Sequence, residues 1–113
     1  MKEFILIFRT EPSPNVLTPE QMKQVTQPWQ DWIGNLAAKG KLADTGARLG
    51  HDSAVVKTND AVTNGPYAEL KEILAGFTVI KAETLQEAIE LTKGCPVFNV
   101  GGSVEVRDLI KMG

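Results

Sequence analysis

Apolar residues recur with the spacing of β-strands in several short stretches of the chain. The stretch from Phe4 to Phe8 is apolar at every position, which is typical of a strand covered on both faces near the centre of a sheet. A second strand is predicted from Leu74 to Ala82. Its alternation places Phe77, Val79 and Lys81 on one face and Thr78, Ile80 and Ala82 on the other.

Weaker patterns predict three further strand regions. From Ser103 to Leu109, apolar side chains that point inward alternate with charged side chains that point outward. The stretch from Lys41 to Gly50 has mixed polarity and contains Gly46, which suits a strand with a bulge or a bend. Residues 53–57 and 61–63 flank a polar turn and predict a short hairpin.

Two helices are marked by their start signals. Thr18-Pro19-Glu20-Gln21 combines a cap, a proline at the first helical position and a capping box, and Gly40 predicts the end of this helix. Thr84-Leu85-Gln86-Glu87 is a second capping box, and Gly94 followed by Pro96 predicts the stop. The apolar residues of the first helix step by threes and fours and predict one buried stripe: Met22, Val25, Trp29, Trp32, Ile33 and Leu36.

This order of elements predicts an α+β domain with ferredoxin-like βαββαβ topology and an inserted hairpin. Both helices then cover one face of an antiparallel sheet, and the other face is bare. One residue of each of three pairs must point to the bare face: Phe4 or Ile5, Phe8 or Ile7, and Phe77 or Ile80. Because a contiguous exposed apolar face is rare in a monomer, we expect a homodimer packed sheet to sheet.

The composition narrows the possible partners and compartments. A chain of 113 residues, of which 42% are hydrophobic, fits a single domain over residues 1–113. The net charge is −2 and the basic residues are interleaved with acidic ones, so we expect no nucleic-acid or membrane partner. The single cysteine, Cys95, suits a reducing compartment, and Phe4 to Phe8 is too short for a signal-peptide core or a membrane span. We therefore expect a cytoplasmic protein.

Three segments together resemble a known family: Asn64 to Glu72, Gly76-Phe77, and Gly101 to Arg107. The combination is similar to the YCII-related family and, more narrowly, to its DGPF branch, named for an Asp-Gly-Pro-Phe motif. Asn64 stands where that branch carries Asp, and Tyr67 where it carries Phe. The resemblance covers most of the chain.

The resemblance implies a ferredoxin-like dimeric α/β barrel, a largely unassigned function and a contextual link to transcription initiation. Some YCII relatives are thought to use a His–Asp pair with the histidine on the first helix. Residues 19–39 contain no histidine, so this pair is not carried over.

Three residues are candidates for catalysis. His51 is the only histidine and could act as a general base oriented by Asp52 or Asp44; the alternative is a solvated loop histidine. Glu69 and Lys71 follow the motif turn and could exchange a proton in a cleft; the alternative is a pair of surface charges. The sequence therefore leaves open whether the protein is an enzyme.

A second group of residues is a candidate for ligand binding. The backbone around the motif turn could bind an anion, Glu72 could share a face with Glu69, and an arginine could clamp a carboxylate; the alternatives are turn formation and solvated charge. The candidates are Arg9, Asn64, Gly65, Pro66, Tyr67 and Glu72.

Two functional interpretations remain open. One is a small-molecule-binding protein or enzyme with a polar pocket near residues 64–72. The other is a non-catalytic dimeric binding or regulatory module associated with transcription initiation. The sequence contains no metal-ligand spacing, phosphate loop or nucleotide motif, so we expect no cofactor.

Overall fold

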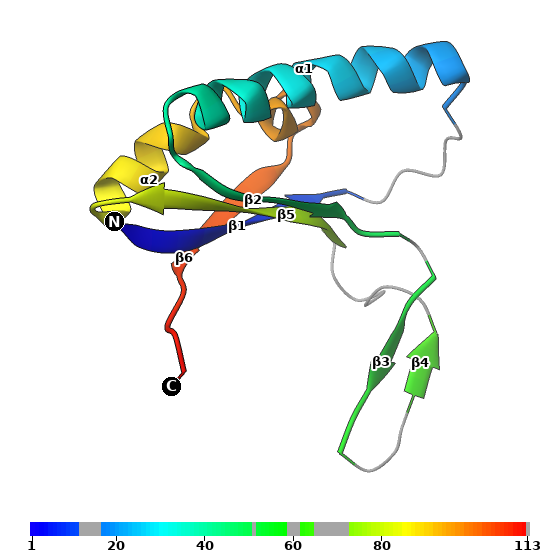
Figure 1. The fold of residues 1–113 in the computed structure, drawn as a ribbon. Coiled ribbons are helices and arrows are strands. Elements are labelled where there is room, and N and C mark those ends of the chain that lie inside the picture. The colour runs from blue at the N-terminus through cyan, green and yellow to red at the C-terminus, as the bar shows by residue number, and fades with distance from the viewer. Residues whose placement is uncertain (12–16, 51, 59–61, 65–72, 113) are drawn as a thin grey trace.

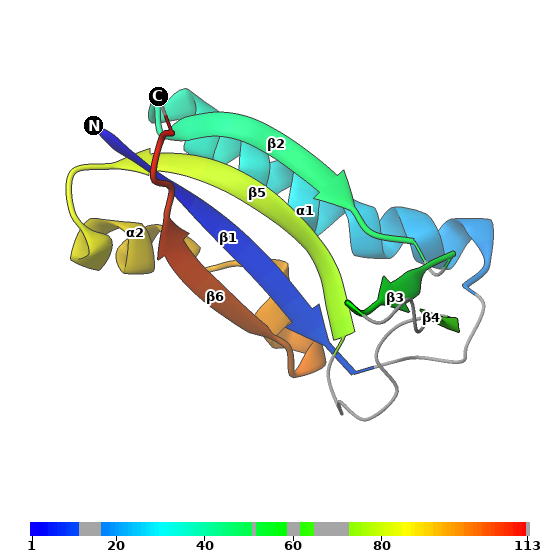
Figure 2. The same cartoon turned by 90° about the horizontal axis from the view of Figure 1, so that it is seen from below.

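The described residues of the chain form a four-stranded antiparallel sheet with two α-helices on one of its faces (Figure 1). The structure is a computed structural model that describes residues 1–11, 17–50, 52–58, 62–64 and 73–112. The strand order is β2-β5-β1-β6, and β3 and β4 form a separate two-stranded sheet (Figure 2). The elements are β1 (Lys2–Thr10), α1 (Pro19–Ala38), β2 (Leu42–Arg48), β3 (Ala54–Val56), β4 (Val62–Asn64), β5 (Ile73–Ala82), α2 (Leu85–Thr92), the 3₁₀-helix η1 (Pro96–Val100) and β6 (Ser103–Asp108).

The central strand β1 separates the two faces of the sheet by simple alternation. Phe4, Leu6 and Phe8 are buried in the core beneath the helices, whereas Ile5 and Ile7 are half-buried on the opposite face. The predicted central position of this strand is confirmed, because β1 pairs with β5 on one side and β6 on the other. All of these pairs are antiparallel.

Helix α1 begins where the sequence predicts. Thr18 Oγ1 accepts a hydrogen bond from the Gln21 backbone N–H, and the Gln21 side chain accepts one from the Thr18 N–H, which completes the capping box. Gly40 follows the helix with φ of +69°, a left-handed conformation that glycine adopts without strain.

The predicted apolar stripe of α1 is buried only in its second half. Trp32 and Leu36 belong to the core, and the rings of Trp29 and Trp32 meet Phe8 edge-on at centroid distances of 4.9 and 5.9 Å. Val25 is 43% exposed because the first half of the helix extends beyond the sheet (Figure 2). Periodicity alone gives the helix face and does not give the length of the surface beneath it.

Helix α2 and the 3₁₀-helix that follows it lie in the same layer as α1. Thr84 Oγ1 accepts from the Glu87 N–H at the start of α2, and Gly94 follows its end at φ of +85°. The sequence does not predict the 3₁₀-helix η1 (Pro96–Val100), because Pro96 indicates only the stop of the preceding helix. Cys95, directly before η1, is 2% exposed and belongs to the core.

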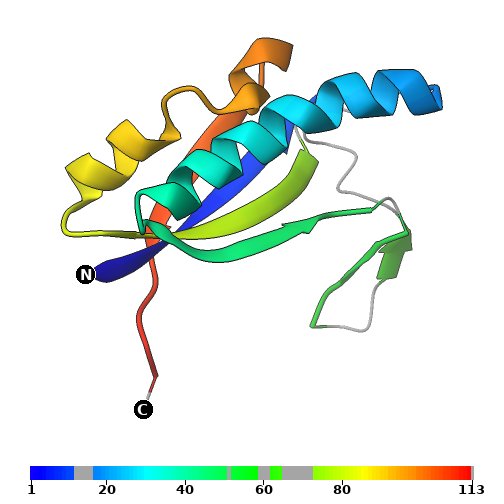
Figure 3. The same ribbon diagram turned by 45° about the horizontal axis from the view of Figure 1, so that its top comes forward.

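The irregular strand predicted from Lys41 to Gly50 and the predicted short hairpin are both confirmed. The pairing of β2 with β5 shifts register twice, and Gly46 lies in this stretch at φ of +75°. In the hairpin, Val56 pairs with Val62. The hairpin lies on the side of the sheet opposite the helices (Figure 3).

This mixed α+β arrangement is compatible with the predicted ferredoxin-like topology, in which the two helices cover a single face. Strand register also settles which residues turn away from the helices: Ile5 pairs with Val79, and Ile7 pairs with Phe77. No helix in the described ranges is both long and apolar enough to cross a membrane.

Candidate functional site

Most of the predicted site residues lie outside the described residues: His51, Gly65, Pro66, Tyr67, Glu69, Lys71 and Glu72. Two predicted residues can be placed. Arg9 lies near the end of β1 in the four-stranded sheet, and Asn64 is the last residue of β4, where its backbone pairs with Ala54. The structure therefore assigns Arg9 and Asn64 to different sheets, and the candidate catalytic residues remain a sequence prediction.

The helix-free face of the four-stranded sheet has an apolar centre; we call it the open face. Its centre consists of Ile5 and Ile7 of β1 with Phe77 and Val79 of β5, which are opposite one another in the register and all half-buried. Directly opposed apolar side chains on antiparallel strands contact each other and form a continuous surface. No described helix covers this surface (Figure 3).

A cluster of charges borders the open face along β1 and β6. The Arg9 guanidinium donates through Nη2 to Glu105 Oε1 at 3.0 Å, and Arg107 Nε lies 2.6 Å from Glu105 Oε2. Glu105 is opposite Ile7 in the register, so this charge cluster lies beside the apolar centre. Two guanidinium groups share one carboxylate, which leaves one positive charge uncompensated within the cluster.

The accessibility of Arg9 permits a further interaction. Its side chain is 31% exposed while it contacts Glu105. A guanidinium has five N–H donors in a fixed fork and can bind a second carboxylate or a phosphate in addition to the first. Strand β5 begins beside it, because Ile73 pairs with Thr10 and Leu74 with Arg9. The described part of the chain therefore brings Arg9 next to the strand that directly follows the motif segment.

Comparison with known protein families identifies the family of this chain. The family model of the YCII-related domain matches residues 4–113. The chain belongs to the YCII-related family. Among curated proteins, no match was found.

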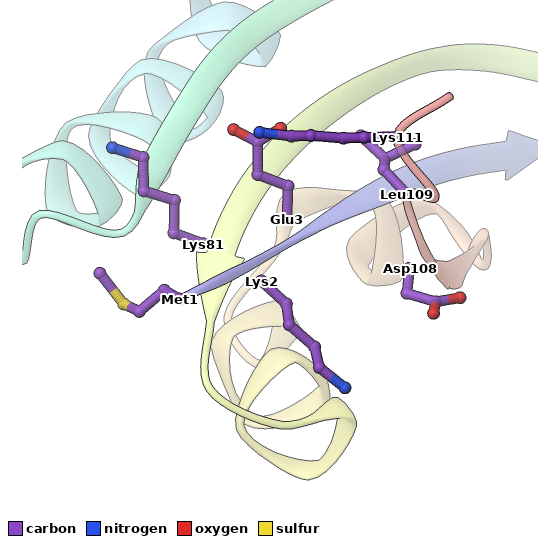
Figure 4. A pocket seen from close by; sticks show the side chains of 7 residues that line it. All are labelled: Met1, Lys2, Glu3, Lys81, Asp108, Leu109 and Lys111. Carbon is purple, nitrogen blue, oxygen red and sulfur yellow. The ribbon is translucent and has the colours of Figure 1, made fainter. Parts of the chain in front are cut away.

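The YCII-related domain has a hollow of about 620 Å³ at the opposite end of β1 from Arg9. It is lined by Met1, Lys2, Glu3, Lys81, Asp108, Leu109 and Lys111. Figure 4 shows Lys2 and Lys81 extending away from each other. These two ammonium groups therefore do not converge on one anion.

A second hollow, of about 370 Å³, lies between the two helices of the domain. Trp32 and Leu91 line it, and the Trp32 indole Nε1–H donates to the Leu91 carbonyl oxygen at 3.3 Å. This bond satisfies the polar atom of a largely buried ring. The tryptophans thus serve packing, as the sequence predicts.

Cys95 is unsuited to nucleophilic chemistry in this domain. Burial raises the pKa of its thiol from 9.0 to about 11, and the side chain is almost inaccessible. A nucleophilic cysteine needs an exposed thiolate at neutral pH. Cys95 therefore serves as a packing residue of the core.

Sequence reasoning missed two members of the charge cluster, Glu105 and Arg107. The alternation from Ser103 to Leu109 correctly placed both side chains on the outward face. Only the pairing of β1 with β6 brings Glu105 to Arg9, and pairing between strands so distant in sequence leaves no local signal.

Proposed function

We propose that this YCII-related domain is a cytoplasmic homodimer, packed sheet to sheet, that binds a small anionic molecule near Arg9 and the motif segment 64–72. The observation that carries the proposal is the open face, where an apolar centre is bordered by two arginines that share one carboxylate. The DGPF branch, suggested by the motif Asn64-Gly65-Pro66-Tyr67, is part of the same proposal.

The apolar centre supports the dimer. Ile5, Ile7, Phe77 and Val79 offer large side chains to whatever covers the open face. Burial of apolar surface stabilises association by roughly 25 cal/mol per Å² before the costs of ordering are subtracted. A second copy offers the same apolar centre, and in a two-fold pair the surface is then complementary to itself.

The charge cluster supports the proposed binding of an anionic molecule. A partner sheet over the open face would remove water from around Arg9 and Glu105, which strengthens every charge–charge interaction there. The uncompensated positive charge would then attract a carboxylate or phosphate group. In this proposal Tyr67, Glu69, Lys71 and His51 complete the pocket, while Asn64 and Gly65 supply turn backbone.

Sedimentation of one variant and its control tests the dimer. Ile7→Asp places a charge at the apolar centre and should yield a folded monomer at a concentration where the wild type is a dimer. Val100→Asp is the matched control, because Val100 is 67% exposed and belongs to η1, a segment that lies on the helix side of the sheet (orange in Figure 1). A wild-type protein that sediments as a monomer would contradict the dimer.

Thermal unfolding with succinate, citrate and inorganic phosphate tests the ligand. A ligand at 100 times its dissociation constant stabilises the folded state by about 2.7 kcal/mol, which is readily seen as a rise in Tm. Arg9→Gln should abolish this rise, whereas Lys93→Gln, which removes a positive charge paired with Glu90, should retain it. Stabilisation that is equal in both variants would contradict a site at Arg9.

The alternative function is a non-catalytic regulatory module that works beside the transcription machinery. It shares the dimer with the first proposal and needs no small molecule at Arg9. The same two measurements separate them, since a dimer that none of the anions stabilises favours the regulatory module.

A further inference from the structure

The β3–β4 hairpin contains too little structure of its own to be stable alone. Each strand has three residues, and the two pair with each other in a sheet separate from the four-stranded one. An isolated two-stranded hairpin is at best marginally stable in water and needs a surface to pack against. The hairpin therefore requires a contact beyond its own strand pairing.

The side chains of the hairpin offer an apolar surface for such a contact. Val56 and Val62 are directly opposite each other in the register and are 68% and 58% exposed. Cross-strand pairs of this kind form one patch, because the two side chains lie on the same face of the ribbon. In contrast to the core valine Val97, which is 1% exposed, this pair has most of its surface in water.

The position of the hairpin indicates what covers this patch. The hairpin projects on the same side of the sheet as the open face, away from both helices (Figures 1 and 3). The C-terminal segment after β6 projects on that side at the other end of the sheet (Figure 1), and its residues Ile110 and Met112 are 82% and 95% exposed. A molecule that covers the open face would therefore lie between two exposed apolar projections.

We propose that the β3–β4 hairpin is an arm that packs its Val56–Val62 pair against the second copy in the dimer. The inference rests on the proposed sheet-to-sheet dimer and adds the arm to its interface. A second copy is favoured over an unrelated partner because the border of the open face carries both charge signs, with Glu105 between Arg9 and Arg107. Such a border can complement its own two-fold image.

Sedimentation of an arm variant measures the contribution of the arm. The double variant V56D/V62D should raise the dimer dissociation constant at least tenfold, because two buried charges replace two apolar contacts in each arm. V100D is the matched control, since Val100 is exposed to the same extent as Val56, and it should leave the constant unchanged. Circular dichroism and Tm of the isolated monomers should be equal for all three proteins. An unchanged dissociation constant in V56D/V62D would contradict the proposal that the hairpin packs against the second copy.

Hydrogen exchange distinguishes failure of the arm from failure of the dimer. Amides of residues 54–56 should exchange at least tenfold more slowly in the wild-type dimer than in the I7D monomer. Wild-type protein diluted below its dissociation constant is a second monomeric reference, should I7D fold poorly. A hairpin that exchanges rapidly in both the dimer and the monomer contradicts the arm and leaves the dimer intact. A hairpin that exchanges slowly in both states is covered by its own chain, which also contradicts the arm, whereas a monomeric wild type contradicts the dimer itself.

Discussion

Arg9 and Glu105, 96 positions apart in the sequence, form an ion pair at 3.0 Å on the helix-free side of the sheet. The contact is diagonal across two strands: Arg9 is opposite Ser103 in the register, and Glu105 is opposite Ile7. It joins the first strand of the chain to the last. Because both side chains remain about one-third exposed, the pair is better suited to positioning charge than to stabilising the fold.

Removing the shared carboxylate should have a small effect on stability and a larger one on anion binding. We expect Glu105→Gln to lower the free energy of unfolding by about 0.2–1 kcal/mol at low salt, and by less at high salt. The same variant should bind the anions of the succinate, citrate and phosphate set more tightly, because two guanidinium groups lose their internal partner. Urea unfolding and calorimetric titration measure the two effects. Glu90→Gln, which removes a carboxylate paired with Lys93 on the exposed surface, is the control. Weaker anion binding by Glu105→Gln would contradict the role assigned to this cluster.

The strands were predictable from the sequence because their side chains follow a period of two. The alternation in β5 assigned Phe77 and Val79 to one face and Ile80 to the other, as the structure confirms. The choice between Ile5 and Phe4 for the open face stayed undecided, since both are apolar and a period of two cannot tell one face from the other. Packing decides it: the edge-on contacts of Phe8 with the two tryptophans fix the even-numbered residues of β1 beneath α1.

Gly46 should tolerate no side chain. Its φ is +75°, and a Cβ built on it would lie 1.8 Å from the carbonyl oxygen of Phe77 in the neighbouring strand. Left-handed strain alone costs of order 1–3 kcal/mol, and the clash adds to it, so Gly46→Ala should destabilise by more than about 2 kcal/mol. Chemical denaturation measures the change.

Gly34→Ala is the matched control for this substitution. Gly34 lies in α1, and apart from its chain neighbours and the nearby backbone of the helix, no atom of the described residues lies within 4 Å of a built Cβ. Alanine should stabilise the helix there by about 0.5–1 kcal/mol. Opposite signs for the two alanine variants are the expected result. A neutral Gly46→Ala would show that the β2–β5 register can shift to accommodate a methyl group.

Cys95 should react slowly with thiol reagents in the native protein. Its pKa of about 11 against 9.0 lowers the native thiolate fraction at pH 8 about a hundredfold, and burial restricts access as well. Absorbance after addition of a disulfide reagent should show rapid labelling only in urea. Ala37→Cys, on the exposed side of α1, adds an internal reference that should label at once. Rapid labelling of the wild type would indicate that η1 opens readily.

The candidate site was less predictable than the fold, for a physical reason. The sequence shows that Arg9 carries a positive charge. The functional role of that charge depends on which side chains from distant strands lie beside it. The outward position of Glu105 was evident from its strand pattern, whereas its contact with Arg9 depends on the β1–β6 register. For the motif segment, the sequence remains the only source, because residues 65–72 lie outside the described part of the chain.

The ion pair between Lys41 and Glu87 should make stability depend on pH in the acidic range. Lys41 Nζ donates to Glu87 Oε1 at 2.7 Å and joins the connection between α1 and β2 to the start of α2. This hydrogen bond, aided by the nearby positive charge, lowers the pKa of the Glu87 carboxyl below its ordinary value of 4.5. A carboxyl whose pKa is lower in the folded chain stabilises that chain above the ordinary pKa, and this stabilisation is lost as the pH falls through the lowered value. Glu87→Gln should therefore be less stable than the wild type at neutral pH, and the difference should shrink steadily below pH 4.5.

Denaturant unfolding of Glu87→Gln and the wild type from neutral pH into this acidic range measures the dependence. Lys41→Met provides the matched background: without the donor, adding Glu87→Gln should produce a much smaller pH-dependent difference. A difference between Glu87→Gln and the wild type that stays constant with pH would show that the glutamate acts by packing alone. A pH-dependent difference of equal size in the Lys41→Met background would show that another group, and not Lys41, favours the ionised carboxylate.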